Sequence, residues 1–224
     1  MMLHEIFEQA CQEHPGAYAA MTTKNEKLTY ATLLSESRQL AHYFAKQGIS
    51  LNQSVAIAMP RSILHLKVTL ALSMIGATSL FIDVLQPLHY LKAIFSDADP
   101  CMIVTTKKFF ATLLNNGTDK IPALILDELE ARQQIDIYPT ASLIVNYGSQ
   151  KEELIAYMCY TSGSTGKPKG VPIKHLGLAY WSALSKKHLN IQPQNIILGF
   201  ASPAFDAYLG ILNGMVWRSC YLLY

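Results

Sequence analysis

The sequence has few charged residues and almost no excess of either sign. Its 224 residues include 18 Lys and Arg against 16 Asp and Glu, which gives a formal net charge of +2. The basic residues are scattered along the chain, so nothing in it indicates a nucleic-acid-binding surface. Half of the residues are hydrophobic. That is enough for one sizeable globular core, or for a core divided between two lobes.

Cysteines and histidines are also sparse and unclustered. The four cysteines, Cys11, Cys101, Cys159 and Cys220, lie far apart and lack the paired spacing of a zinc site or a disulfide framework. Cys101 and Cys159 lie in apolar runs, and we expect both to be buried thiols. The histidines form no cluster with metal-ligand spacing. This usage fits a reducing compartment, so we expect a cytoplasmic protein.

No stretch has the length and apolarity of a membrane span. Residues 1–10 carry Glu5 and Glu8 and no apolar core segment, which argues against a signal peptide. The most apolar stretch is 68–85, but it contains Gly76 and Asp83. A spanning helix needs about 20 consecutive apolar residues. We therefore expect a buried helix followed by a buried strand in this stretch.

Apolar periodicity predicts alternating helices and strands. The expected helices cover 3–13, 30–47, 61–75, 87–96, 127–134 and 174–189. The expected strands cover 17–22, 27–29, 54–59, 77–82, 101–105, 123–126, 154–160, 170–173 and 196–200. Strands that alternate with helices predict an α/β fold with a mostly parallel sheet and flanking helices. Within the helix 174–189 we expect Trp181 to lie in the core.

A loop rich in hydroxyl groups follows the expected buried strand 154–160. Between Tyr160 and Val171 the chain holds four Ser or Thr residues, three glycines and two lysines. Glycines let a backbone bend sharply and approach a ligand. Backbone N–H groups, hydroxyls and ammonium groups together bind polyphosphates. The alternative is a flexible Gly/Ser linker, but such linkers seldom follow a buried strand directly.

The loop is neither of two common nucleotide-binding motifs. A Walker loop needs Gly-x-x-x-x-Gly-Lys-Ser/Thr, whereas here Thr161 takes the place of the first glycine and Pro168 follows Lys167. The dinucleotide fingerprint Gly-x-Gly-x-x-Gly is missing as well. The string from Met158 to Lys169 instead resembles, at every position, the phosphate-binding signature of the adenylate-forming superfamily. That superfamily includes acyl-CoA synthetases, luciferases and the adenylation domains of nonribosomal peptide synthetases.

The resemblance implies an ATP-dependent ligase. Such enzymes convert a carboxylic acid to an acyl-adenylate and then usually transfer the acyl group to a thiol. ATP and Mg²⁺ are the implied cofactors, with Thr165 as the candidate contact to Mg²⁺. Lys167 is better explained as a solvated loop lysine. The residues implied to hold the ATP phosphates are Thr161, Ser162, Gly163, Ser164, Thr165, Gly166 and Lys169.

A second motif, Phe205-Asp206, bears on the substrate. It resembles the Phe-Asp pair of amino-acid-activating members, in which the aspartate binds the substrate's ammonium group. A buried carboxylate is costly unless it is paired, and a cationic substrate would supply the partner. The alternative is that Asp206 only caps the following helix, and the two roles can coexist. Without an ammonium anchor, the substrate would be a fatty or aryl acid.

By this resemblance, residues 1–224 correspond to the N-terminal portion of an adenylation domain, without its C-terminal lid domain. We assign no catalytic residue in the chain and expect it to be inactive alone. It would require a downstream polypeptide for turnover, and a carrier protein or coenzyme A would accept the acyl group. The alternative is a non-catalytic remnant or an interaction module. We expect residues 218–224 to form an apolar strand with an unpaired edge and exposed apolar surface.

Overall fold

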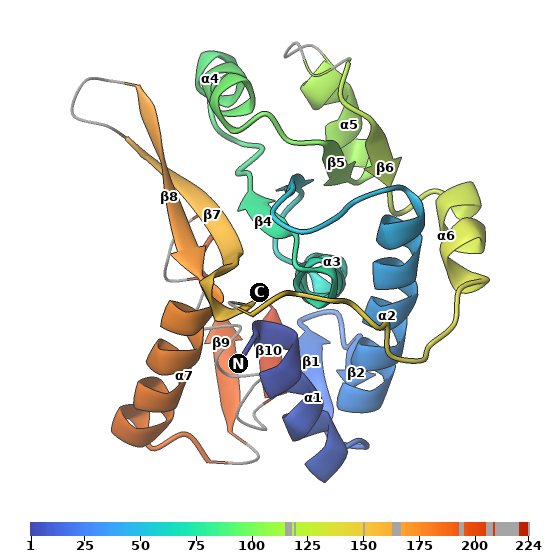
Figure 1. Cartoon of the computed structure of the whole chain (residues 1–224), viewed down its shortest axis with the longest axis vertical. Helices are drawn as coiled ribbons and strands as arrows, with labels where there is room; N and C mark the ends of the chain where they lie inside the picture. The colour runs from blue at the N-terminus through green and yellow to red at the C-terminus, as the bar shows by residue number, and fades with distance from the viewer. Residues whose placement is uncertain are drawn as a thin grey trace.

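The computed structural model describes residues 1–114, 118, 120–149, 151–162, 167–192, 195–204, 208 and 220–223. These residues form an α/β fold with two separate sheets and helices packed against them (Figure 1). Most neighbouring strands are parallel, as the sequence predicts. None of the helices in this part of the chain is long and apolar enough to cross a membrane.

The larger sheet has six strands in the order β6-β5-β3-β4-β7-β8. All its neighbours are parallel except β7 and β8, which form an antiparallel hairpin. Apolar residues on both faces bury the central strands, as expected for a parallel sheet covered by helices. The strands are β3 (Ser54–Ala58), β4 (Thr78–Phe81), β5 (Met102–Thr105), β6 (Ala123–Ile125), β7 (Ile155–Ser162) and β8 (Pro168–Lys174).

The smaller sheet contains β2 (Lys27–Thr29), β1 (Tyr18–Thr22), β10 (Cys220–Leu223) and β9 (Ile196–Gly199), in that order. The prediction of an unpaired edge at the last strand is wrong. β10 lies between β1 and β9 and is parallel to both. Its Leu223 is only 4% exposed. Among the described strands of this sheet, β2 and β9 form the edges.

Seven α-helices connect and cover these strands in the described part of the chain. α2 begins where the hydroxyl of Thr29 accepts the Thr32 N–H at 3.2 Å. α5 has no counterpart among the predicted helices. The helices are α1 (Leu3–Glu13), α2 (Tyr30–Lys46), α3 (Ile63–Ile75), α4 (Leu88–Ala98), α5 (Lys107–Leu114), α6 (Leu129–Asp136) and α7 (His175–Leu189).

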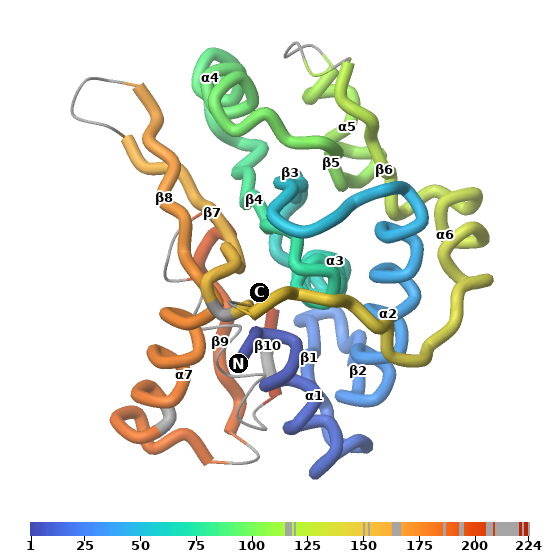
Figure 2. Tube along the Cα trace, in the orientation of Figure 1, coloured from blue at the N-terminus to red at the C-terminus, as the bar shows by residue number. Residues whose placement is uncertain are grey.

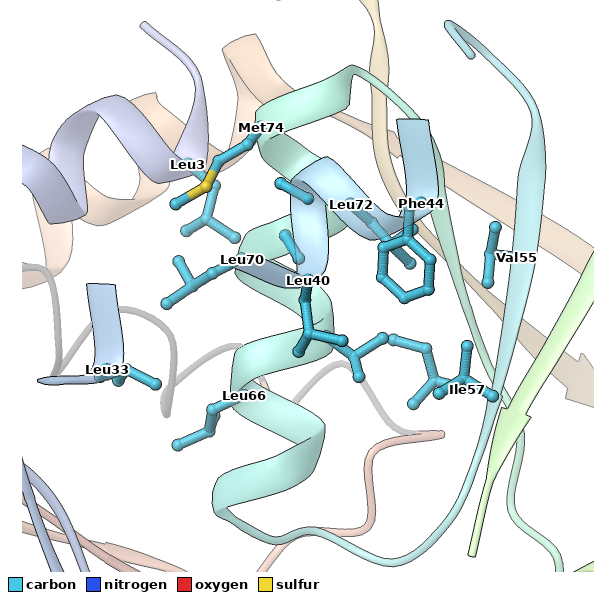
Figure 3. Close-up of a cluster of buried hydrophobic side chains, with 14 of the residues drawn as sticks. Leu3, Leu33, Leu40, Phe44, Val55, Ile57, Leu66, Leu70, Leu72 and Met74 are labelled. Carbon is cyan, nitrogen blue, oxygen red and sulfur yellow. The ribbon is translucent and has the colours of Figure 1, made fainter. Parts of the chain in front are cut away.

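The main core lies between α2, α3 and β3. Leu40 and Phe44 of α2 face Leu72 of α3 and Val55 of β3 (Figure 3). α3 ends at Gly76, whose φ of +70° lies in the left-handed region that favours glycine. A Cβ added there would also lie 2.4 Å from Cδ2 of Leu51. The helix therefore ends at this glycine, as the sequence predicts.

An extended segment, 138–149, crosses the surface before the chain enters β7 (Figure 2). Side chains of α2 hold its backbone. Gln39 Nε2 donates to the Tyr138 carbonyl at 3.1 Å, and His42 Nε2 lies 3.0 Å from the Ala141 carbonyl. The polar composition of the segment suits this exposed position.

α7 buries several polar side chains and exposes large apolar ones, which is the reverse of an ordinary surface helix. Its buried stripe holds His175, Ser182 and Ser185 beside Leu178. Trp181 is 42% exposed, so the prediction that it lies in the core is wrong. The exposed side of α7 carries large apolar side chains, namely Leu176, Tyr180, Trp181, Leu184 and Leu189. Helices usually bury their apolar face, so the described residues leave the main packing face of α7 uncovered.

Candidate functional site

The β7–β8 hairpin carries the predicted phosphate-binding residues at its outer end, away from the rest of the sheet (Figure 1). Thr161 pairs with Lys169, and Ser162 pairs with Pro168. Cross-strand partners project to the same face of a sheet. The hairpin therefore brings Thr161 and Lys169 together, and both are exposed.

The described part of the signature differs from expectation in one respect. β7 continues to Ser162, two residues beyond the predicted strand, so Thr161 and Ser162 belong to the hairpin strand itself. Lys167, the lysine that we expect to be solvated, is also exposed. The four remaining predicted phosphate-binding residues, Gly163, Ser164, Thr165 and Gly166, lie outside the described residues.

A cavity of about 560 Å³ lies between α4 and the inner part of this hairpin. Phe81 and Tyr157 form one wall, with stacked rings whose centroids are 5.3 Å apart. Val171 and Ile173 of β8 add further apolar surface. Its polar lining residues include Asp83, Gln86, Thr161 and Ser162. The cavity is therefore an apolar space with a rim of oxygen-bearing side chains beside the predicted phosphate site.

The segment after β9 closes the cavity from another side. Ser202 donates from its hydroxyl to Oδ2 of Asp83 at 3.3 Å. Ala204 lines the cavity. The next two residues are the predicted substrate-binding pair, Phe205 and Asp206, which lie outside the described residues. The cavity is thus lined by Thr161 and Ser162 of the first motif and by the residue that directly precedes the second motif in the sequence.

Asp83 is a site residue that the sequence analysis leaves without a role. Its Oδ1 accepts the Leu85 N–H at 3.0 Å, which forms a turn directly after β4. The position of Asp83 directly after a buried strand could have indicated this role from the sequence. Ligands in parallel sheets bind beyond the carboxyl ends of the strands. β4 and β7 are parallel neighbours, so residues following β4 meet the end of β7.

A buried contact links α3 to the region of the second motif. Nδ1 of His65 lies 2.8 Å from the hydroxyl of Tyr208, the second residue after Asp206. His65 and Tyr208 are both fully buried. Burial lowers the pKa of His65 to about 3, so this imidazole is neutral at physiological pH.

His175 joins α7 to α1 and is also buried and neutral. Its Nδ1 accepts the Leu3 N–H at 3.2 Å. Its Nε2 has no hydrogen-bond partner among the described residues. Burial is the main cause that lowers the pKa of His175 to about 3, with help from the positive charges of His4 and the N-terminus and against the opposing effect of Glu5.

The stability of the protein should therefore fall on acidification. Unfolded histidine has a pKa near 6.5, so between about pH 6.5 and 3 the unfolded state binds more protons than the folded state. Each buried histidine then lowers the free energy of unfolding by up to about 1.4 kcal/mol per pH unit as the pH falls. We expect His175→Asn, which keeps an acceptor for Leu3, to reduce this slope in urea titrations between pH 7 and 4.

The control for that titration is His89→Asn, because His89 is exposed on α4. This variant should leave the pH dependence unchanged. An unchanged slope in His175→Asn would show that the imidazole of His175 gains a proton in the folded state as readily as in the unfolded state.

The fold and the hairpin define a nucleotide-binding α/β domain of the adenylate-forming type, and comparison with known proteins agrees. The sequence profile described as "AMP-binding enzyme" matches residues 7–223. The chain therefore belongs to the AMP-binding enzyme family, a family of adenylate-forming ligases.

The relatives that match the chain are longer than it is. Novobiocin biosynthesis protein H of Streptomyces niveus is 33% identical over 210 residues, covering 92% of this chain and 34% of the relative. Tyrocidine synthase 1 of Brevibacillus parabrevis is 30% identical, covering 99% of this chain and 20% of the relative. A solved complex of VinN with 3-methylaspartate has a TM-score of 0.88 at 20% identity, covering 99% of this chain and 61% of that one. The chain thus spans about a third or less of the two curated relatives.

The residues at the cavity rim suit the cofactors that the family implies. Hydroxyl and carboxylate oxygens, as found on Thr161, Ser162 and Asp83, are the donors that Mg²⁺ prefers. The ammonium of Lys169 suits phosphate. Thr165, the predicted Mg²⁺ contact, lies outside the described residues and stays a prediction.

Proposed function

We propose that residues 1–224 form the N-terminal portion of an adenylation domain that activates an amino acid as its acyl-adenylate. One observation carries the proposal. The same cavity is bordered by Thr161 and Ser162 of the phosphate signature and by Ala204, which directly precedes Phe205-Asp206. ATP phosphates and an acid bound at these two places would lie side by side.

The reaction would join a carboxylate oxygen to the α-phosphorus of ATP and release pyrophosphate. Its main obstacle is the approach of two negatively charged groups. Lys169 and Thr161, paired at the end of the hairpin, would hold the β- and γ-phosphates and stabilise the charge that develops on the leaving pyrophosphate. Mg²⁺, when bound, would neutralise part of the same charge. The apolar walls formed by Phe81 and Tyr157 would limit access of water.

An amino acid is the favoured substrate because of Asp206. A carboxylate beside the apolar Phe205 gains a partner if the substrate carries an ammonium group. The name of one solved neighbour agrees, since VinN was solved with 3-methylaspartate. A carrier protein or coenzyme A would then accept the acyl group. The four cysteines lie far apart in the sequence without paired spacing, which fits a reducing compartment, and we place the protein in the cytoplasm.

ATP–pyrophosphate exchange across a panel of amino acids and fatty acids tests this function, in the enzyme completed by its downstream polypeptide. Two variants separate the roles of Asp206. Asp206→Ser keeps a good helix cap but removes the charge, whereas Asp206→Ala removes both. We expect both variants to lose amino-acid-dependent exchange. If Asp206→Ser kept amino-acid-dependent exchange, Asp206 would only cap the helix. If only fatty acids supported exchange, the substrate would be a fatty acid and not an amino acid.

The exposed face of α7 is the proposed contact for that downstream polypeptide. Tyr180 and Leu184 lie one turn apart on this face, and Leu176 lies a turn before Tyr180. The relatives carry two-thirds or more of their length outside the matched segment. We propose that a segment corresponding to part of that length covers this face, because large apolar patches are seldom left in water. The charged end of the helix at Lys187 disfavours a second copy of the chain packed against the same face.

Matched charge substitutions test this contact. We expect Tyr180→Glu, at a position 70% exposed on α7, to abolish exchange in the mixture of chain and downstream polypeptide. Leu129→Glu, at a position 64% exposed on α6, should leave exchange unchanged. Neither variant should alter the urea midpoint of the chain alone. Equal exchange by the two variants would place the contact elsewhere.

A second candidate function is a non-catalytic remnant or interaction module. The uncovered face of α7 is the observation that favours it, since such a surface suits a binding partner whether or not the chain takes part in catalysis. Absence of exchange in every mixture, with the chain folded and α7 still needed for binding the partner, would establish this function instead.

A further inference from the structure

A side-chain hydrogen bond links the proposed phosphate-binding hairpin to α4, an element outside the signature. The hydroxyl of Tyr160, the residue before Thr161, donates to Oδ2 of Asp97 at 2.6 Å. Asp97 lies in the last turn of α4, 63 residues earlier in the chain. Tyr160 is only 8% exposed, whereas Thr161 and Ser162 after it are exposed. Tyr160 is therefore the last buried residue of β7.

The sheet itself supports this part of β7 weakly. The ladder between β4 and β7 covers only Tyr157 and Met158. From Cys159 onward, the described backbone partners of β7 belong to β8, the other arm of the same hairpin. The outer hairpin thus leaves the sheet as a two-stranded ribbon, and such ribbons are marginally stable by themselves.

Tyr160 also fixes the second arm. It is paired with Gly170 of β8. A Cβ added to Gly170 would lie 3.1 Å from Cζ and 3.2 Å from the hydroxyl oxygen of Tyr160. The ring therefore lies directly across the backbone of Gly170, and a larger residue there would push it away from Asp97. The same tyrosine contacts both arms of the hairpin and α4.

The hydroxyl of Tyr160 keeps the proton that it donates to Asp97. Burial raises the pKa of Tyr160, and the hydrogen bond to Asp97 raises it further. The hydroxyl is thus a stable donor, and hydrogen bonds to a charged acceptor are among the stronger ones in proteins.

We propose that Asp97 is a positioning residue for nucleotide binding, which acts by holding Tyr160 and so fixing the direction of the hairpin that carries Thr161, Ser162 and Lys169. The inference rests on the proposed phosphate-binding function of this hairpin. It assigns a role to α4 that the phosphate signature does not include.

Titration of MgATP into the native chain and five variants tests the proposal. Tyr160→Phe and Asp97→Ala should each weaken binding by about tenfold, the effect of one charge-assisted hydrogen bond. Their combination should be no weaker than either variant alone, because both remove the same contact. Asp97→Asn keeps an acceptor and should restore most of the affinity. Tyr43→Phe is the control, since Tyr43 is also 8% exposed but lies on α2.

Amide hydrogen exchange distinguishes positioning from a loss of overall stability. Peptides that cover 155–174 should exchange faster in Tyr160→Phe and Asp97→Ala. The midpoints of urea unfolding of these two variants should stay close to that of Tyr43→Phe. Hairpin exchange equal to the native chain, or additive effects of the two substitutions on MgATP binding, would overturn the proposal. If the native chain failed to bind MgATP, nucleotide binding by the chain alone would be refuted, and hydrogen exchange would still decide whether the contact fixes the hairpin.

Discussion

Lys169→Ala is expected to weaken the binding of MgATP to the chain by about thirtyfold, the free energy of one strong charge-assisted contact. Lys169 is paired with Thr161 across the hairpin, so its ammonium projects to the same face as the hydroxyl that would meet the phosphates. Calorimetric titration of the native and variant chains measures the effect. Part of the effect should also disappear at high salt, because Lys169 is exposed.

Lys167→Ala is the matched control for this prediction. Both residues are exposed lysines at the outer end of the same hairpin, two positions apart. Only Lys169 has a described cross-strand partner in the phosphate signature. The control should change affinity by less than about twofold, since a solvated lysine contributes little. If both variants lost the same affinity for MgATP, the two lysines would contribute only general positive charge. The assignment of Lys169 as a specific phosphate contact would then be wrong.

Leu223→Asp is expected to destabilise the folded chain by about 3–5 kcal/mol, enough to unfold many domains. Leu223 is 4% exposed on β10, the strand that joins the two halves of the smaller sheet. A carboxylate at this buried position would lack a partner. Urea denaturation followed by circular dichroism measures the change.

Leu198→Asp provides the comparison within the same sheet. Leu198 lies on the edge strand β9, is 53% exposed and is paired with Leu222 of β10. The substitution should cost less than about 1 kcal/mol, as is usual for exposed positions. If both variants were equally stable, β10 would not lie at the centre of the sheet, and the described pairing would be contradicted.

The sequence predicts local structure well where the signals are local. Thr29 and Gly76 mark a helix start and a helix end, and the glycine-rich signature marks the hairpin. The position of β10 was not predictable in this way, because its partners β1 and β9 are chosen by tertiary packing. α5 was missed although α6, which also has eight residues, was predicted.

The candidate site shows the same division. Thr161, Ser162 and Lys169 follow from a contiguous motif, and the structure places them at the outer end of the β7–β8 hairpin. Asp83 and Asp97 come from other elements, and their proximity to the motif depends on the order of strands and on the packing of α4. In α7 the periodicity predicted the helix but could not show which face the described residues cover. The role of Asp206 stays a prediction.

The measurement that most directly tests phosphate binding by the hairpin is a titration of the chain with Mg²⁺ complexes of ATP, pyrophosphate and AMP. The hairpin is proposed to hold the β- and γ-phosphates, so ATP and pyrophosphate should bind with similar affinity and AMP much more weakly. Protection from amide exchange should centre on residues 161–162 and 167–169. Equal binding of AMP, or protection centred on other elements, would contradict the account.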